Sequence, residues 1–469
     1  MRCKIDRQEA LEFEPSNLKV TNEYYRRYET ISRLLDESPA ILDRIHRDLL
    51  GALAEERQRN RAFLYTSDNV LRILVAQICE GESLRGIVVR VDDSWGLRRF
   101  ARIHHGPMMD YSTLCRLKNA IRPKTWNEVN ELLTESAIET ESIVGDELRL
   151  DTTAVETNIH FPTDSTLLWD TYRVVGRLVK RAREIDPEAV GTRRLQARKA
   201  KRLAVAIARR TRRQRRKPDD EKHAYAALFG LVDALLTWAA EVCAELDRAL
   251  KDDLYESVRV TAIQAVARDL AHFLPLGQRV LDQARRRIEH GEKVPSSEKL
   301  YSLFEPETQL LVRGKAHRHI EFGHMVLLEQ VRGNFITGYE VFAKKTMEAS
   351  TVDPVLGRHE RRFGSPPRAL AADKAFYESM PKLREIEQRV EVVAIGKMGR
   401  RTDAEREREE TASYKYAQRF RAGIEGTIGF VKRCLRLARC FNKSYDHFVA
   451  TVGATVFAHN LVVLARGYG

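Results

Sequence analysis

The sequence has few cysteines, and they form no recognisable pattern. Only six occur in 469 residues, and no two of them are separated by two residues. A C-x-x-C pair is the signature of zinc ribbons and of many thiol redox sites, so the sequence supports neither class. In a chain of this length, scattered cysteines are typical of reduced and mostly buried thiols, which favours a cytosolic protein.

Long apolar runs are also missing from the sequence. The first fifteen residues, MRCKIDRQEALEFEP, do not contain the apolar core of a signal peptide. No run approaches the roughly 20 apolar residues of a membrane-spanning helix. We therefore expect a soluble, intracellular protein that makes no contact with a membrane.

Acidic residues are too few to balance the basic ones. The chain has 80 lysines and arginines against 67 acids, which gives a net charge of +13, and its pI is about 9.4. A polyanionic partner such as DNA would account for this excess, because each neutralised phosphate releases counterions. A generally basic protein without such a partner is the alternative, and charge alone does not separate the two.

Hydrophobic periodicity divides the chain into four parts. The N-terminal part is predicted to be helical, because apolar residues recur there at helical spacing, for example after Ser38-Pro39. A segment rich in β-branched residues, 147–159, predicts a first strand. Helical periodicity then returns over about 166–292, before strands and helices alternate. We predict an N-terminal helical domain, the first part of a sheet domain, a helical insertion and the remainder of the sheet domain, at residues 1–140, 141–164, 165–300 and 301–469.

The last helix of the N-terminal part has a basic side. It begins at Asp110 to Ser112, and Arg116 and Lys118 lie beside its apolar side. Short helices with tight turns and a basic last helix are typical of a helix-turn-helix-like module that binds DNA. An ordinary helical bundle with solvated charges explains the same pattern equally well.

The helical insertion contains a second basic segment. Residues 193–217 include many arginines and lysines and no acid, and the predicted helix has only a narrow apolar stripe. This composition favours sequence-independent contact with nucleic acid over a solvated face, with Arg209, Arg210 and Arg213 among the candidates. The third long helix of the insertion is predicted to be interrupted at Leu274-Pro275.

The elements after the insertion suggest a fold. Two strands, HMVLLEQV and FITGYEVF, are joined by a hairpin turn at Arg332-Gly333-Asn334. The charged segment 400–413 is predicted to be a surface loop. Further strands and helices are predicted at 368–373, 390–395, 414–439 and 444–466. Without the insertion, the order is strand, strand, strand, helix, strand, helix, strand, helix, which is typical of an RNase H-like domain. The fold class is therefore α+β and mostly helical, with a mixed sheet flanked by helices.

Three acids fall on separate elements of this order. Asp151 lies in the first strand, Asp373 ends the apolar run ALAA, and Glu425 lies on the helix after the last strand. An acid in an apolar strand is costly unless it is paired or bound to a metal. Each acid has a simpler explanation: an ion pair with Arg149 for Asp151, a turn for Asp373 and an ion pair with Arg421 for Glu425. Their joint placement favours a site for Mg²⁺, which prefers carboxylates, waters and phosphates.

The helix that carries Glu425 has an unusual composition, RFRAGIEGTIGFVKR. At roughly 100° per residue, Arg421, Glu425 and Lys432 fall within one sector, beside an apolar face. Each glycine lowers helix propensity by about 1 kcal/mol relative to alanine. Three glycines therefore suggest a close approach, either by the sheet or by DNA, at Gly423, Gly426 and Gly429.

This segment resembles the C-terminal signature of insertion-sequence DDE transposases, Y-x2-R-x3-E-x6-K. Arg421, Glu425 and Lys432 match the spacing, whereas Gln418 stands at the tyrosine position. The first-Asp and second-Asp motifs of these families are similar to LRLDTTAVETNIHFPTDSTLLWD and ALAADKAFYES. Their N-terminal helical domain is similar to SLRGIVVRVDDSWGLRRF followed by DYSTLCRLKNAI. In the ISNCY-type group, the stretch before the second and third strands is similar to SLFEPETQLLVRGKAHRHIEFGHMVLLEQ.

The resemblance implies a Mg²⁺-dependent DNA transposase that also accepts Mn²⁺. Such an enzyme binds double-stranded transposon ends and target DNA, cleaves at the ends and transfers a 3′-hydroxyl strand. It would act as a homodimer or higher oligomer on DNA, in the bacterial cytoplasm at the nucleoid. Asp151, Asp373 and Glu425 would hold the metal. Basic residues of the same segment would contact phosphates: Arg421, Lys432 and Arg433.

Two other functions stay open at this point. The first is a non-catalytic DNA-binding protein, such as a repressor or a domesticated transposase. The second is another RNase H-like nuclease, such as a junction resolvase. One departure from better-known relatives is the position of the insertion, which follows the first Asp instead of separating the second Asp from the Glu. We therefore assign no hairpin chemistry to the insertion.

Overall fold

The structure is a computed structural model that describes residues 3–5, 16–52, 65–212, 218–251, 257–312 and 320–467. Contacts divide the chain into two compact units. Unit 1 comprises residues 1–158 and 324–469, and unit 2 comprises residues 159–323. The chain therefore leaves unit 1 just after the first strand and re-enters it within the third.

Helices precede the first strand of unit 1, as predicted. Their bounds are α1 (Lys19–Glu37), α2 (Pro39–Gly51), α4 (Ser67–Cys79), α5 (Leu84–Asp93), α6 (Trp95–Ala101), α7 (Tyr111–Ala120) and α8 (Pro123–Glu139). Pro39 lies in the first turn of α2, and Thr66 forms a capping box with Asn69 at the start of α4. The side chain of Asp110 caps α7, where the sequence predicts a helix start.

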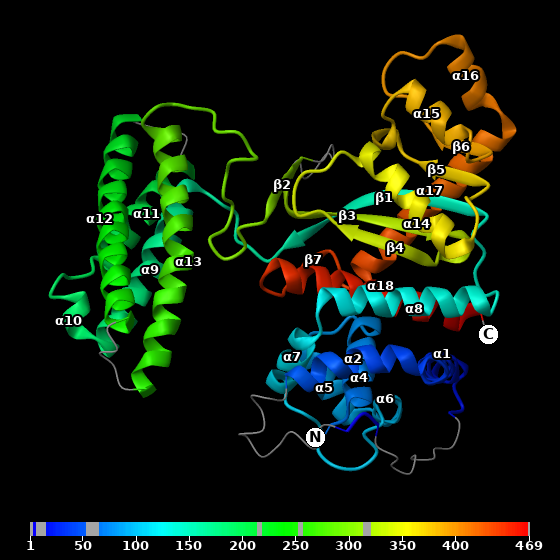
Figure 1. The fold of residues 1–469 in the computed structure, drawn as a ribbon, viewed down its shortest axis with the longest axis horizontal. Coiled ribbons are helices and arrows are strands. Elements are labelled where there is room, and N and C mark those ends of the chain that lie inside the picture. The colour runs from blue at the N-terminus through cyan, green and yellow to red at the C-terminus, as the bar shows by residue number, and fades with distance from the viewer. Residues whose placement is uncertain are drawn as a thin grey trace. The chain divides into compact units, whose positions relative to one another are not determined.

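In the described part of the chain, seven strands form one mixed, open sheet, which with the helices gives an α+β fold (Figure 1). The strands are β1 (Glu147–Thr157), β2 (Gln309–Val312), β3 (Ile320–Val331), β4 (Ile336–Val341), β5 (Ala369–Ala372), β6 (Val392–Ile395) and β7 (Arg439–Cys440). The main order is β2-β3-β1-β5-β6, with β4 beside β3 and β7 beside β1. The β1–β5 and β5–β6 pairs are parallel, whereas β2–β3 and β3–β4 are antiparallel. The predicted hairpin at Arg332–Asn334 is confirmed, as η1.

The two faces of the sheet pack against different sets of helices, and side chains along each strand point to the two faces in turn. Leu148, Leu150 and Leu370 pack in one cluster with apolar residues of α14 (Val352–Phe363) and α15 (Met380–Glu387). Ala371 and Ala394 instead pack against α17 (Ala412–Arg433). Because side chains alternate along a strand, the odd-numbered residues 147, 149 and 151 of β1 belong to the α17 face. The remaining short elements are η2 (Glu348–Thr351), η3 (Lys374–Phe376) and α16 (Asp403–Glu410).

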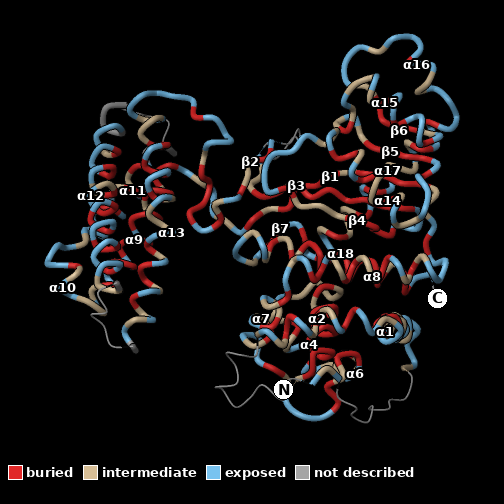
Figure 2. The backbone as a smooth tube through the Cα atoms, viewed as in Figure 1, coloured by how far each residue is buried: buried red, intermediate tan, exposed pale blue. Residues whose placement is uncertain are grey.

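Helix α18 (Tyr445–Gly467) is buried along most of its length (Figure 2). It packs against α1, α4, α8 and β4. Asn460 bonds both backbone groups of Ile336, accepting from its N–H and donating to its carbonyl oxygen. Within the described residues, two helical segments are long and apolar enough to cross a membrane, residues 222–250 and α18. Two such helices are weak evidence for a membrane protein, since core helices such as α18 have the same composition, and the structure is compatible with a soluble protein.

Unit 2 contains a helical bundle, as the periodicity of residues 166–292 predicts, together with β2 and the first residues of β3. It contains α9 (Asp164–Ile185), α10 (Pro187–Val190), α11 (Ala197–Arg212), α12 (Pro218–Lys251) and α13 (Ser257–Ile288). One apolar cluster joins these helices, including Leu168, Val232 and Leu281. The buried face of each amphipathic helix therefore finds its partner within the unit.

Two local predictions are wrong. Pro275 does not interrupt its helix, because α13 continues through it, and buried residues on both sides, Leu270 and Val280, keep the two halves packed. Residues 400–413 are not a loop throughout, because α16 forms within them. Thr402 and Glu405 make a capping box there, and Lys397 donates to Glu405 over 2.8 Å.

Candidate active site and nucleic-acid interface

Neighbouring parallel strands bring Asp151 and Asp373 together. The register of the two strands pairs Leu148 with Leu370 and Arg149 with Ala371. Continued by two residues, this register places Asp151 of β1 opposite Asp373, which directly follows β5. The Asp373 side chain accepts the N–H of Ala375 over 2.7 Å, so the carboxylate is fixed at the strand end. Two acids predicted from separate motifs therefore meet at one edge of the sheet.

The surroundings of Asp151 disfavour its negative charge. Burial is the main cause, and the nearby carboxylates of Asp373 and Glu348 add to it; together they raise the pKa of Asp151 to about 6. Two groups act in the other direction, the N–H of Thr152, which donates to Asp151 over 2.7 Å, and the guanidinium of Arg421. A divalent cation would relieve the remaining repulsion, and it prefers carboxylate oxygens.

Glu348 is an acid of this region that the sequence analysis missed. It begins η2, and its carboxylate accepts a short hydrogen bond from the hydroxyl of Thr152. Because Thr152 follows Asp151 in β1, Glu348 lies close enough to influence the Asp151 carboxyl. The surrounding sequence, KTMEAST, offers no signal beyond an acid before a helix, so only the tertiary structure reveals it.

Glu425 lies on α17, as predicted, but its side chain is turned toward solvent. Its carboxylate is 3.6 Å from Arg421 Nη2, and the side chain is 68 % exposed, compared with 21 % for Arg421. Arg421, one helical turn earlier, is the residue whose charge reaches Asp151. Among the described residues, no three His, Cys, Asp or Glu side chains are arranged to hold a metal ion. The structure thus unites two of the three predicted ligands.

Gln418 attaches the start of this helix segment to the ends of two strands. Its amide donates to the carbonyl oxygens of Ala394, over 2.6 Å, and Ala372, over 3.4 Å. Its side-chain oxygen accepts the Nε–H of Arg421 over 3.2 Å. The residue at the tyrosine position of the resembled signature therefore connects the strand that leads to Asp373 with Arg421.

Only one of the three glycines on α17 faces the sheet. A Cβ atom at Gly423 would lie 2.3 Å from Nη1 of Arg149, whereas a Cβ atom at Gly426 would meet nothing within 4 Å. At Gly429 the nearest atom, at 2.8 Å, belongs to the flexible side chain of Arg433. The close approach by the sheet is therefore real at Gly423, and the other two glycines have no such explanation.

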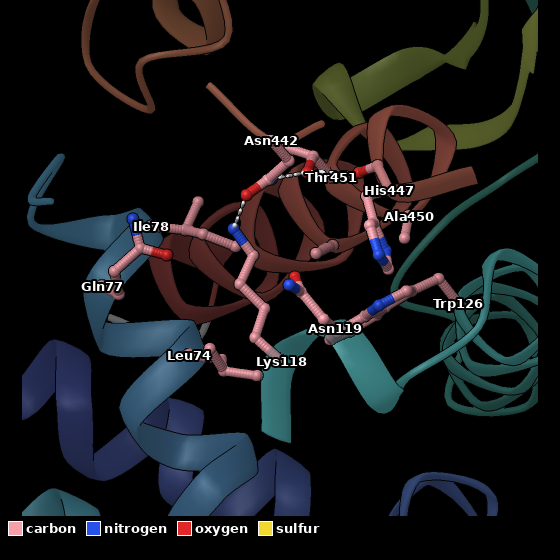
Figure 3. Close-up of a pocket in the computed structure, with 11 residues that line it drawn as sticks. Leu74, Gln77, Ile78, Lys118, Asn119, Trp126, Asn442, His447, Ala450 and Thr451 are labelled. Carbon is pink, nitrogen blue, oxygen red and sulfur yellow. Dashed lines mark hydrogen bonds between the residues drawn. The ribbon is translucent and has the colours of Figure 1, made fainter. Parts of the chain in front are cut away.

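The predicted DNA-binding residues differ in how they are placed. Arg116 on α7 and Arg433 at the end of α17 are exposed, and Lys432 is half-buried. The ammonium group of Lys118 points into a narrow pocket, where it donates to Asn442 over 3.4 Å (Figure 3). Burial lowers the pKa of Lys118, so this residue is not presented to a phosphate in this conformation.

In unit 2, the basic helix of the prediction is α11. Arg209 is exposed and lines a shallow basic surface with Arg198, Lys201 and Arg202. Arg210 belongs to α11, but its side chain is not among the described ones, and Arg213 lies outside the described residues. The arginine-rich helix is therefore present, and its contact with nucleic acid stays a prediction.

The donor set of the acidic edge fits a hard cation. Mg²⁺ is commonly held by one or two carboxylates, with waters and substrate phosphates completing its octahedron. Asp151 and Asp373 supply two carboxylates, and burial, together with the charges of Asp373 and Glu348, raises the pKa of Asp151. In contrast to a zinc site, no cysteine or histidine ligand is needed here.

Comparisons with known proteins identify no relative. No family model, no curated protein and no solved structure matches the chain. Its function must therefore be argued from its own residues.

Proposed function

We propose that this chain is a metal-dependent DNA transposase with an RNase H-like catalytic domain. The pairing of Asp151 with Asp373 on neighbouring parallel strands carries the proposal, because two acids from distant motifs meet there. The order of strands and helices and the match of Arg421, Glu425 and Lys432 to the transposase signature support it. The net charge of +13 suits a DNA partner.

Asp151 and Asp373 would hold Mg²⁺ or Mn²⁺ at the edge of the sheet, and Glu425 would complete the ligand set after a rotation of its exposed side chain. When bound, the cation would activate a water or a 3′-hydroxyl and would stabilise the charge that develops during in-line displacement at phosphorus. Arg421 and Lys432 would bind DNA phosphates beside the acids, with Arg433, Arg116 and Arg209 extending the contact. The enzyme would work as a homodimer or higher oligomer on transposon ends in the bacterial cytoplasm.

A non-catalytic DNA-binding protein is the second candidate. The observation that favours it is the outward position of the Glu425 side chain, whose near partner is Arg421 rather than the acid pair. In that case, salt-sensitive binding would be the whole activity, and neutralising the acids would leave it unchanged.

Strand transfer with the DNA ends that flank the gene tests the proposal. Purified protein is incubated with labelled ends and a target plasmid, with and without Mg²⁺. Wild type should cleave and join only with the metal, and Asp373→Ala should bind the ends but neither cleave nor join. Glu407→Gln on exposed α16 is the matched control and should act as wild type. Full activity of Asp373→Ala would refute catalysis at this edge, and metal-independent binding without cleavage would favour the second candidate.

A further inference from the structure

A buried arginine next to the acid pair donates its hydrogen bonds to neutral groups, as far as the described residues show. Arg149 is 4 % exposed, and its guanidinium donates to Gln330 Oε1 over 2.7 Å, to Asn334 Oδ1 over 2.6 Å and to the carbonyl oxygen of Phe420 over 2.5 Å. The Phe420 ring also stacks against it, 4.6 Å from the guanidinium carbon. Burial lowers the pKa of Arg149 to about 10, although the nearby carboxylate of Glu147 acts in the opposite direction.

Another buried arginine of the same unit, Arg72, is paired directly with carboxylates. Arg72 is fully buried, but it pairs with Asp68 over 2.8 Å and with Asp36 over 2.7 Å. The carboxylate of Glu147 near Arg149 accepts its hydrogen bond from Arg332 instead. A buried charge without a directly bonded counterion is unfavourable, and an apolar residue often stabilises such a position better. Stability alone therefore does not explain why an arginine occupies position 149. Its planar guanidinium, with donors in fixed directions, suggests that it holds neighbouring elements in position.

The partners of Arg149 explain what that role would be. Gln330 lies on β3, Asn334 on η1 and Phe420 on α17, so one side chain on β1 joins three other elements. Gln330 extends the network by donating to the hydroxyl of Thr427, further along α17, over 2.9 Å. Phe420 immediately precedes Arg421, and Arg149 lies two residues before Asp151 on the same face of β1. The guanidinium thus connects the strand of the first acid with the helix of the third.

Resting on the proposed function, we infer that Arg149 is a positioning residue, which holds α17 so that Arg421 is presented to the Asp151–Asp373 pair and Glu425 stays one helical turn away. Gly423 leaves the space that the Arg149 guanidinium occupies. A Cβ atom at this position would lie 2.3 Å from the guanidinium, so any larger residue must displace the arginine or the helix. Gly426, on the same helix, has open space around its Cα and provides a matched control.

The experiment uses the full chain and four variants: Gly423→Ala, Gly426→Ala, Arg149→Met and the double variant Arg149→Met/Gly423→Ala. Amide hydrogen exchange of residues 418–427 reports the attachment of the helix without any need for activity. Cleavage and end binding with Mg²⁺ report its consequence. Both alanine changes raise helix propensity alike, so their difference isolates the contact with Arg149.

Gly423→Ala and Arg149→Met should increase exchange in 418–427 but not in α18, and should reduce cleavage at least tenfold while end binding changes less than threefold. The double variant should be no worse than either single one, because both changes break the same contact. Gly426→Ala should match wild type in cleavage. Unchanged exchange, or faster exchange with normal cleavage, would overturn the inference. If wild type fails to cleave at all, the proposed function fails, while the exchange data still decide whether Arg149 holds the helix.

Discussion

Replacement of Asp151 by asparagine should make the protein more stable and inactive at once. In the folded state, burial and neighbouring carboxylates raise the pKa of Asp151 from 3.8 to about 6. A raised carboxyl pKa means that stability from this group is complete below pH 4 and is lost as the pH rises through 6. At pH 7 the difference amounts to at most about 3 kcal/mol. Asparagine keeps the acceptor for the Thr152 N–H and removes the charge, so it should recover part of this free energy.

Thermal unfolding measured by circular dichroism tests this prediction. For a cooperative unit of about 300 residues, 3 kcal/mol raises the melting temperature by on the order of 5 °C. Without divalent metal at pH 7.5, Asp151→Asn should therefore melt a few degrees above wild type, and the gap should close at pH 4. Added Mg²⁺ should stabilise wild type and leave the variant unchanged, because the ion binds the native acid pair.

The matched control for this experiment is Glu407→Gln, on the exposed face of α16, which should change stability by less than about 0.5 kcal/mol. Two results would refute the reasoning. One is an Asp151→Asn variant that is less stable than wild type at every pH. The other is an equal stabilisation of both proteins by Mg²⁺, which would place the cation elsewhere.

Three further predictions concern the helix and the core. Gln418→Leu should lower the free energy of unfolding by about 1–3 kcal/mol, because the buried carbonyl of Ala394 loses its donor; urea denaturation measures this, and an unchanged midpoint would contradict it. Glu425→Gln should change stability by less than about 0.5 kcal/mol, because its ion pair is exposed, yet it should abolish Mg²⁺-dependent cleavage; retained cleavage would exclude Glu425 as a ligand. Burial lowers the pKa of three histidines to about 4, so the free energy of unfolding from urea denaturation should fall as the pH drops from 6.5 to 5, by about 2 kcal/mol for each ring that is neutral in the folded state. A free energy that does not fall over this range would contradict the prediction for these residues: His324, His359 and His459.

The sequence predicts those features that depend on local pattern. The strand at 147–159 appears as β1, and the acid at the end of the ALAA run is a strand-end residue, because β-branched and apolar runs report burial directly. The proximity of Asp151 and Asp373 also follows from the order of the elements, since parallel neighbouring strands bring their carboxyl ends to the same edge of the sheet. The sequence does contain a start signal for α16, because Thr402 and Glu405 have the spacing of a capping box. The high charge of the segment nevertheless favours the prediction of a surface loop.

Features that depend on side-chain direction could not be predicted. Periodicity places Lys118 beside a basic helix face, but it does not show that the ammonium turns inward toward Asn442. It also gives no sign that Arg149 crosses from β1 to the Phe420 carbonyl, because its partners lie roughly 180 and 270 residues away along the chain. Glu348 belongs to the same class, since only the folded chain brings it to Thr152.

The burial of α18 has a consequence for the order in which the protein acquires its structure. Helices α1, α4 and α8, near the start of the chain, complete their packing against a helix that ends at Gly467. During synthesis, the apolar faces of these helices lack this partner until α18, more than 300 residues beyond α8, has emerged. Contacts between residues far apart in the sequence slow folding and prolong the exposure of aggregation-prone apolar surface. Until α18 is made, α1, α4 and α8 would therefore expose apolar surface that chaperones can bind, even though each has a strong local helical signal.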